Sequence, residues 1–187
     1  IPYKKPHPSW GFWDSTPAEF RAWCDELGLE IPAVHFNRDI TSEELFEDTV
    51  QIFKTLRCKK LVIPCKFCKT KESLDELIDY INRWQPRLAE RDITLVYHNH
   101  YQEFMLNEDE LFMHTELQKR TNVRFEIDVF WCPYAGVNPV YVLETLKDRV
   151  DLIHFRDGLT TRSPQEFRLL GKGTTPLADV YKWAEKN

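Results

Sequence analysis

Histidine and acidic side chains recur where short apolar runs of this 187-residue chain end. His98 and His100 close one run, Glu103 follows them, and Asp128 and His154 close the next two runs. A single histidine on an apolar strand is usually a core residue, but several at equivalent positions suit imidazole and carboxylate ligands of one divalent ion. We therefore expect His98, Asp128 and His154 to be metal ligands.

Asp128 is the strongest single candidate, because it lies inside the apolar segment FEIDVF. An ionised carboxylate in a strand is costly unless it is paired or coordinated. A salt bridge to Arg156 or Lys172 is the alternative explanation. We favour the metal, since His154 is expected one strand over at a similar depth.

The elements that would position these residues are strands alternating with helices. Apolar runs of strand length lie at residues 31–36, 60–64, 93–98, 124–129 and 150–155. Most are continuous rather than alternating, as in strands that helices cover on both faces. Helix-start signals stand between them, at residues 16–19, 41–44, 73–76, 107, 138–139 and 175–176. This order predicts parallel βαβ units.

Two architectures fit five parallel strands: an open doubly wound sheet, and part of an eight-stranded barrel. The only GxG, at residues 171–173, follows a long loop, so no strand is followed by a glycine-rich phosphate turn. The polar residues stand at the C-terminal strand ends, where barrel enzymes carry their chemistry. We predict an α/β fold of the (β/α) TIM-barrel type over residues 1–187, a single partial domain that lacks the first two strands and the last.

Composition excludes several classes of protein. The formal net charge is −5 and no Lys/Arg stripe stands out, which argues against binding to nucleic acid. No apolar run approaches the roughly 20 residues of a membrane helix. The amino-terminal IPYKKPHPSW has no apolar core typical of a signal peptide, and the five cysteines are odd in number. We expect reduced thiols, including those of the Cys65–Cys68 CxxC pair, and a cytoplasmic location.

Three segments carry a resemblance to a known family: LVYHNHYQEF, FEIDVFWCPYAGVNP and RVDLIHFRDG. In this order and at this spacing they resemble the sugar phosphate isomerase/epimerase family of xylose-isomerase-like TIM barrels. The segment GKGTTPLADVYKWAEKN looks like the loop and helix that follow the seventh strand in that family. The resemblance covers about residues 16–187 and implies a start after the second barrel strand.

The resemblance implies one divalent ion, often Mn²⁺, Mg²⁺, Co²⁺ or Zn²⁺, held by four side chains at strand ends. His98 matches a position that glutamate often holds, while Asp128 and His154 match the family's aspartate and histidine. The fourth ligand, a glutamate on the eighth strand, has no counterpart here. Arg156 replaces the lysine of the HxKD motif, which keeps a cation but changes a point charge into a planar fork.

The implied activity is that of an isomerase or epimerase acting on a sugar, keto-sugar or inositol derivative. In such an enzyme the metal polarises a carbonyl and a hydroxyl while a proton moves at the adjacent carbon. The two-glutamate form of this chemistry is not supported here, so we expect His100 or Glu103 to act as a single base. A lyase or dehydratase acting on a keto-sugar fits the same ligands.

Five further residues are expected to contact substrate: His35, Trp131, Arg156, Asp157 and Lys172. Trp131 would stack on a sugar, although packing is the commoner role of an aromatic ring beside a strand. Arg156 and Lys172 would hold a phosphate or hydroxyl groups, and salt bridges explain them equally well. His35 either contacts substrate or only packs.

Two other functions fit the same sequence. One is a metal-dependent nuclease resembling the endonuclease IV branch of the superfamily, which the net charge of −5 disfavours. The other is an inactive or truncated barrel that acts as a structural or interaction protein. Its open sheet edges would then pair with another chain, which would make it a homo-oligomer.

Overall fold

The computed structural model describes residues 15–161 and 163–187. The segment IPYKKPHPSW, which the sequence predicts not to be a signal peptide, lies outside the described residues. The chain divides into two compact units. The first consists of Ile1–Pro64 and Ile81–Val96, and the second consists of Cys65–Tyr80 and Tyr97–Asn187. The single domain that the sequence suggested therefore stays a prediction.

Five parallel strands form the main sheet: β1 (Val34–His35), β2 (Lys60–Ile63), β3 (Thr94–His98), β4 (Arg124–Asp128) and β5 (Val150–His154). They follow one another in the sheet in chain order. A doubly wound sheet would reverse its strand order at a switch point, whereas a barrel adds each strand beside the previous one. The predicted (β/α)-barrel architecture, present only in part, is confirmed.

Helices lie between the strands at α1 (Pro17–Glu26), α2 (Glu43–Leu56), α3 (Lys71–Ala89), α4 (Met113–Arg120), α6 (Pro139–Thr145) and α7 (Leu177–Lys186). Shorter helical turns are α5 (Trp131–Tyr134), η1 (Gln102–Phe104) and η2 (Lys147–Arg149). The capping box at Thr16 and the cap at Asn138 form as predicted. A capping side chain satisfies amide groups that the first helical turn leaves without partners, which is why these starts are readable.

The helix predicted to begin at Asn107 was misplaced, because α4 begins at Met113. The Asn107 side-chain oxygen accepts hydrogen bonds from the backbone amides of Asp109 (3.1 Å) and Leu111 (2.9 Å). An asparagine side chain that bonds to nearby amides closes a turn and competes with helix formation. Residues 107–111 are therefore a turn that precedes the helix.

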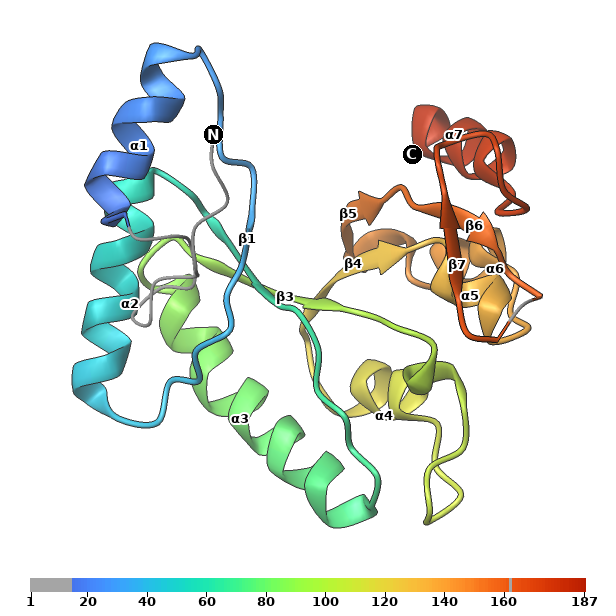
Figure 1. The fold of residues 1–187 in the computed structure, drawn as a ribbon. Helices are drawn as coiled ribbons and strands as arrows, with labels where there is room; N and C mark the ends of the chain where they lie inside the picture. Colours follow the sequence, from blue (N-terminus) through green and yellow to red (C-terminus); the bar gives the residue numbers. More distant parts are fainter. Residues whose placement is uncertain (1–14, 162) are drawn as a thin grey trace. The chain divides into compact units, whose positions relative to one another are not determined.

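The first unit has its own core between α2 and the second half of α3. The α2 face that is buried consists of Phe46, Thr49, Val50, Ile52, Phe53 and Leu56. Phe46 stacks on Trp84 of α3, with ring centroids 5.5 Å apart. Arg87 of α3 forms a bidentate ion pair with Glu43 of α2. α1 lies alongside α2 in this unit (Figure 1).

The second unit is built around β4 and β5, which pair in parallel so that Asp128 lies opposite His154. A short antiparallel hairpin that the sequence did not predict follows them, formed by β6 (Asp157–Leu159) and β7 (Glu166–Arg168) (Figure 1). α6 and α7 contact each other in the same unit. In the described parts of the chain, every helix is too short or too polar to cross a bilayer.

Candidate metal centre

Three of the predicted ligands come together at the carboxyl ends of β3, β4 and β5. His98, Asp128 and His154 are the last residues of these strands, and each offers a ligand atom within 4.8 Å of the other two. Asp128 Oδ2 lies 3.8 Å from His98 Nε2 and 3.4 Å from His154 Nδ1. Three side chains far apart in sequence thus converge on one point.

The Asp128 carboxylate is fully buried, and its two oxygens differ. Oδ1 accepts a hydrogen bond from the backbone amide of Phe130 at 3.0 Å, whereas Oδ2 has no hydrogen-bond donor among the described residues. Burial raises the pKa of this carboxyl, and the charges of Arg156 and His98 offset that rise in part. Oδ2 also forms an ion pair with Arg156 Nε at 3.3 Å, so the salt bridge that the sequence offered as an alternative is present. A buried oxygen that faces two imidazoles and makes no hydrogen bond with a described residue also fits a divalent cation, because such an atom is costly to bury. The residues therefore fit a divalent ion.

The backbone of Asp128 is held by the side chain of Asn99, which is fully buried. Asn99 Oδ1 accepts from the Asp128 amide at 3.0 Å, and Asn99 Nδ2 donates to the Asp128 carbonyl oxygen at 3.3 Å. The asparagine thus replaces the peptide group of a neighbouring strand at the point where pairing ends. Sequence reasoning passed over Asn99, although its place directly after His98 at a strand end was visible.

A second residue that sequence reasoning passed over is Glu126, two positions before Asp128 on β4. Its Oε2 lies 2.7 Å from His98 Nδ1. An ionised carboxylate only accepts hydrogen bonds, so this contact places a proton on Nδ1 and leaves Nε2 as the ring nitrogen nearer to Asp128, 3.8 Å from Oδ2. The period of two along a strand, which puts Glu126 and Asp128 on one face, was the available signal.

His100 and Glu103, the predicted catalytic residues, lie in the segment after β3. The His100 ring is 5.0 Å from the His98 ring and 5.5 Å from the Trp131 ring, measured between centroids. Glu103 is buried, and its carboxylate accepts from the Tyr97 hydroxyl at 2.9 Å and from the His100 amide at 2.8 Å. Burial raises the pKa of Glu103 despite these hydrogen bonds.

Comparisons with known proteins agree with the fold. A family model described as a xylose isomerase-like TIM barrel matches residues 3–187. The chain belongs to the xylose isomerase-like TIM barrel family. No curated protein sequence matches it.

Solved structures of similar fold include several members of this barrel family. A sugar phosphate isomerase/epimerase from Parabacteroides distasonis has 19% identity and a TM-score of 0.77, and the match covers 92% of this chain and 65% of that one. The probable 3-DHS dehydratase AsbF of Bacillus anthracis has 11% identity and a TM-score of 0.68, with 91% and 72% covered. A zinc-bound IOLI protein has 14% identity and a TM-score of 0.63, with 92% and 69% covered. The chain thus spans 65% of the first of these barrels.

Two of the residues expected to contact substrate lie beside the group formed by His98, Asp128 and His154, which is called the ligand cluster below. Arg156 Nε is 3.3 Å from Asp128 Oδ2, and its guanidinium carbon lies 5.7 Å from the Trp131 ring centroid. Trp131 is buried among other aromatic rings, those of Tyr101, Phe130, Tyr134 and Phe167. A stacking contact between Trp131 and a sugar stays a prediction.

Asp157 has partners that explain its burial without a substrate. Its carboxylate accepts from the backbone amides of Gly158 (2.8 Å), Gly173 (2.8 Å) and Thr175 (3.2 Å). Burial alone would raise the pKa of Asp157, but these hydrogen bonds bring it below its ordinary value. The side chain therefore holds the segment that carries Lys172. The substrate contacts expected of Asp157, of exposed Lys172 and of His35 at the end of β1 stay predictions.

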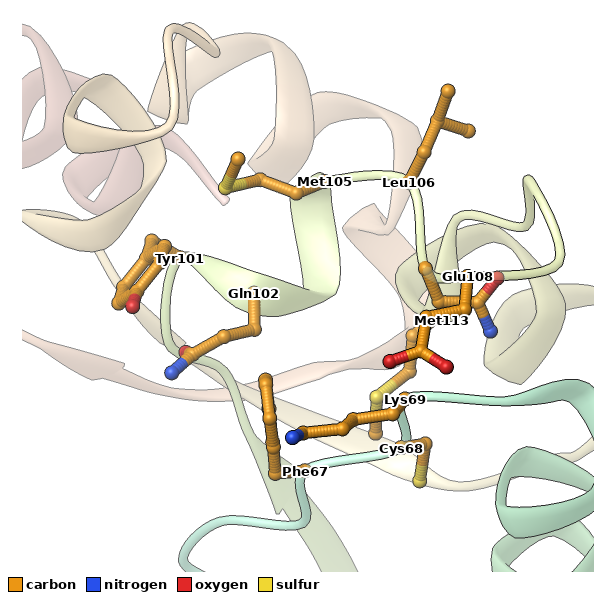
Figure 2. A pocket seen from close by; sticks show the side chains of 10 residues that line it. Phe67, Cys68, Lys69, Tyr101, Gln102, Met105, Leu106, Glu108 and Met113 are labelled. Atoms are coloured by element: carbon orange, nitrogen blue, oxygen red, sulfur yellow. The ribbon is translucent and has the colours of Figure 1, made fainter.

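A pocket of about 290 Å³ lies elsewhere in the second unit, between residues 67–69 and 101–113 (Figure 2). Its walls are mostly apolar, and the Lys69 side chain extends to the Phe67 ring, with Nζ 5.5 Å from the ring centroid (Figure 2). Tyr101 lines this pocket and also lies 5.6 Å from Trp131, between ring centroids. The pocket thus borders the aromatic rings beside the ligand cluster.

Proposed function

We propose that this chain is the metal-binding part of an enzyme that moves a proton at a carbon next to a carbonyl group. The substrate would be a sugar, a keto-sugar or an inositol derivative, and the reaction an isomerisation or epimerisation. The observation that carries this proposal is the buried Asp128 Oδ2, which faces His98 and His154 and accepts no hydrogen bond in the described parts of the chain.

His98, Asp128 and His154 would hold the ion, and Glu126 would orient His98. When bound, the ion would polarise a carbonyl oxygen and a neighbouring hydroxyl of the substrate. Two imidazoles and one carboxylate suit Zn²⁺, Co²⁺ or Mn²⁺ better than Mg²⁺, which prefers oxygen ligands. A fourth ligand from a longer protein would complete the set that the family resemblance implies.

His100 is the residue that we propose moves the proton. The imidazole would take a proton from the carbon beside the carbonyl, and the electron pair of the broken C–H bond would move onto the carbonyl oxygen. The same imidazole would return the proton to the former carbonyl carbon on the same face, while the proton of the neighbouring hydroxyl passes to the former carbonyl oxygen, which gives the isomer. Histidine suits this task because it gains and loses protons near neutral pH.

Glu103 would position His100 rather than meet the substrate. Its two oxygens already accept hydrogen bonds from Tyr97 and from the His100 amide, and the side chain is 1% exposed. A base must reach the proton that it removes. The catalytic role expected of Glu103 from the sequence therefore has less support than the same role for His100.

Metal binding tests the first half of the proposal. The chain should retain about one equivalent of zinc after dialysis, and Asp128→Asn should retain almost none. Asp151→Asn is the matched control, because Asp151 lies on β5 with 13% of its side chain exposed and pairs with Arg124 away from the cluster. Zinc retained equally by all three proteins would refute the proposed centre.

Proton exchange tests the second half. With zinc bound, the chain should exchange a keto-sugar's proton for deuterium from solvent, in a screen of keto-sugars and inososes. His100→Ala should abolish this exchange and leave the zinc content unchanged. Full exchange in that variant would remove His100 from the mechanism.

Elimination of water from a keto-sugar is a second candidate reaction. It is supported by the place of His100 beside His98, because in an elimination one group can remove the proton from carbon and then give it to the leaving hydroxyl as water departs. The likeness to AsbF, a probable dehydratase, is consistent with it. An unsaturated product that absorbs ultraviolet light would identify elimination, whereas an isomerase would give a product of unchanged composition.

A further inference from the structure

We propose that Arg156 and Trp131 form an anion-binding subsite, so that the substrate carries a carboxylate or a phosphate. This inference rests on the proposed function for the identity of the site, and it narrows the substrate to an acidic sugar derivative. It depends on two hydrogen-bond donors, the Arg156 guanidinium and the Trp131 indole N–H. Among the described residues, the guanidinium pairs only with Asp128, and the indole N–H has no acceptor.

Arg156 is held in place from three sides. Its Nε lies 3.3 Å from Asp128 Oδ2, and its guanidinium carbon lies 5.7 Å and 5.0 Å from the ring centroids of Trp131 and Phe167. Aromatic faces attract a guanidinium and restrict its orientation. The cation is therefore arranged before any ligand arrives, which reduces the entropy lost on binding.

The same guanidinium retains donors for a ligand. A guanidinium carries five N–H groups, and the ion pair with Asp128 engages only the Nε end. Arg156 makes no hydrogen bond with any other described residue, and 29% of its side chain is exposed. The four N–H groups of the two terminal nitrogens can thus form the paired hydrogen bonds that carboxylates and phosphates accept.

Trp131 supplies the second donor. The residue is 4% exposed, and its Nε1 has no hydrogen-bond acceptor among the described residues. The indole N–H can only donate, and a buried donor without an acceptor destabilises the folded chain. Its ring is also the one that faces the Arg156 guanidinium. An anion bound here would accept hydrogen bonds from both the Arg156 guanidinium and the Trp131 indole N–H.

A neutral hydroxyl would fit less well. A carboxylate or a phosphate accepts two parallel hydrogen bonds from one guanidinium, whereas a hydroxyl offers only one oxygen to this pair of donors. Arg156 replaces the lysine of the related motif, and the planar fork matches the two oxygens of a carboxylate or phosphate better than a point charge does. The arrangement therefore favours an acidic substrate over a neutral polyol.

The test compares three probes that share one carbon chain: sorbitol, gluconate and sorbitol 6-phosphate. Calorimetry on the metal-free chain comes first, because a carboxylate could otherwise bind the ion itself. We expect gluconate or sorbitol 6-phosphate to bind at least tenfold more tightly than sorbitol, and the better of the two identifies the anion. The titrations are then repeated with the zinc-loaded chain.

Variants separate the subsite from general charge effects. Arg156→Gln should remove the preference for the anionic probe, and Arg156→Lys should restore only part of it. Trp131→Phe keeps an aromatic ring and removes the N–H, so it should weaken binding of the anion severalfold and leave sorbitol unchanged. Arg168→Gln, an exposed arginine on β7, is the control and should change nothing. Circular dichroism checks that each variant is folded.

Two results would overturn the inference: equal affinity for all three probes, or an anion preference that survives both Arg156→Gln and Trp131→Phe. Either would assign Arg156 to Asp128 alone, as its counter-ion. The proposed metal centre fails by a different result, the absence of bound zinc. An anion preference that depends on Arg156 in a chain without zinc affinity would uphold the subsite and refute the centre.

Discussion

At the scale of single residues, the contact between His98 and Glu126 would place a carboxylate one step away from the proposed metal. Where the family resemblance places a glutamate ligand, this chain has an imidazole, and a glutamate on the next strand lies 2.7 Å from its Nδ1. A carboxylate that orients a metal-binding histidine fixes its tautomer and raises its basicity. The negative charge near the site is therefore kept although the ligand has changed.

Glu126→Gln should lower zinc affinity by about 10–100-fold, the usual effect of removing a partner that orients a ligand. Competition with a chelator measures the affinity, and ¹⁵N spectra of His98 report whether Nδ1 still carries the proton. Asp151→Asn, at similar burial on β5, should lower stability without changing zinc affinity. Unchanged affinity in Glu126→Gln would show that Glu126 has no part in the centre.

His114 is a buried histidine outside the site, and burial lowers its pKa to about 4 from the ordinary 6.5. Its folded-state pKa lies below the unfolded value, so the unfolded chain binds a proton first as the pH falls. The stability that neutral His114 contributes is complete above pH 6.5 and is lost between 6.5 and about 4. Its Nε2 has no hydrogen-bond partner among the described residues that would oppose this effect.

His114→Phe should therefore flatten the pH dependence of unfolding. The ring lies against Phe104 and Phe125, at 4.6 Å and 5.5 Å between centroids, so phenylalanine suits the site. Between pH 6.5 and 5 the parent chain should lose about 1.6 kcal/mol more than the variant, because the unfolded histidine is half protonated at pH 6.5 and the slope rises toward about 1.4 kcal/mol per pH unit below it. Urea unfolding at the two pH values measures this difference. Parallel curves for the two proteins would refute it.

At the scale of elements, the β6–β7 hairpin and residues 171–175 depend on each other. Asp157 accepts hydrogen bonds from the amides of Gly173 and Thr175, and the Thr174 amide donates to the Gly158 carbonyl oxygen at 2.8 Å. The segment passes so close that no side chain fits at Gly173. A Cβ there would collide with Asp157 Oδ1 and lie 2.5 Å from the Gly158 backbone.

Gly173→Ala should thus release this segment and destabilise the chain by more than a glycine substitution in open space. Gly136→Ala is the comparison, since no atom lies near its Cβ and only its positive φ of 80° opposes alanine, at about 1–2 kcal/mol. Urea unfolding gives both values, and limited proteolysis reports opening of residues 171–175. An equal or smaller loss for Gly173→Ala would show that the segment tolerates displacement.

Most elements could be read from the sequence because their signals are local. Thr16 and Asn138 cap helices as expected, and the continuous apolar runs became parallel strands. The elements that were missed have two other causes. The Asn107 side chain bonds to the amides of its own turn instead of capping a helix, and β6 and β7 are too short to show a periodic pattern.

At the scale of the whole molecule, the three proposed ligands all belong to the second compact unit. A ligand that binds only the folded state stabilises the part that holds it, by about 2.7 kcal/mol at a concentration 100-fold above its Kd. Zinc should therefore slow amide hydrogen exchange in β4 and β5 more than in α1 and α2 of the first unit. Hydrogen-exchange mass spectrometry measures this difference, with Asp128→Asn as the control. Equal protection of both units would place the zinc elsewhere or couple the units tightly.

The sequence alone determined the alternation of strands and helices and the positions of His98, Asp128 and His154 at the carboxyl ends of three strands. It could do so because side chains alternate along a strand, and the carboxyl ends of parallel strands share one edge of the sheet. Only the tertiary structure decided what each side chain faces. It placed Glu126 beside His98, brought Gly173 and Thr175 to the Asp157 carboxylate and placed Arg156 beside two aromatic rings. Those choices depend on distances between residues on different strands, which the order of residues along the chain does not contain.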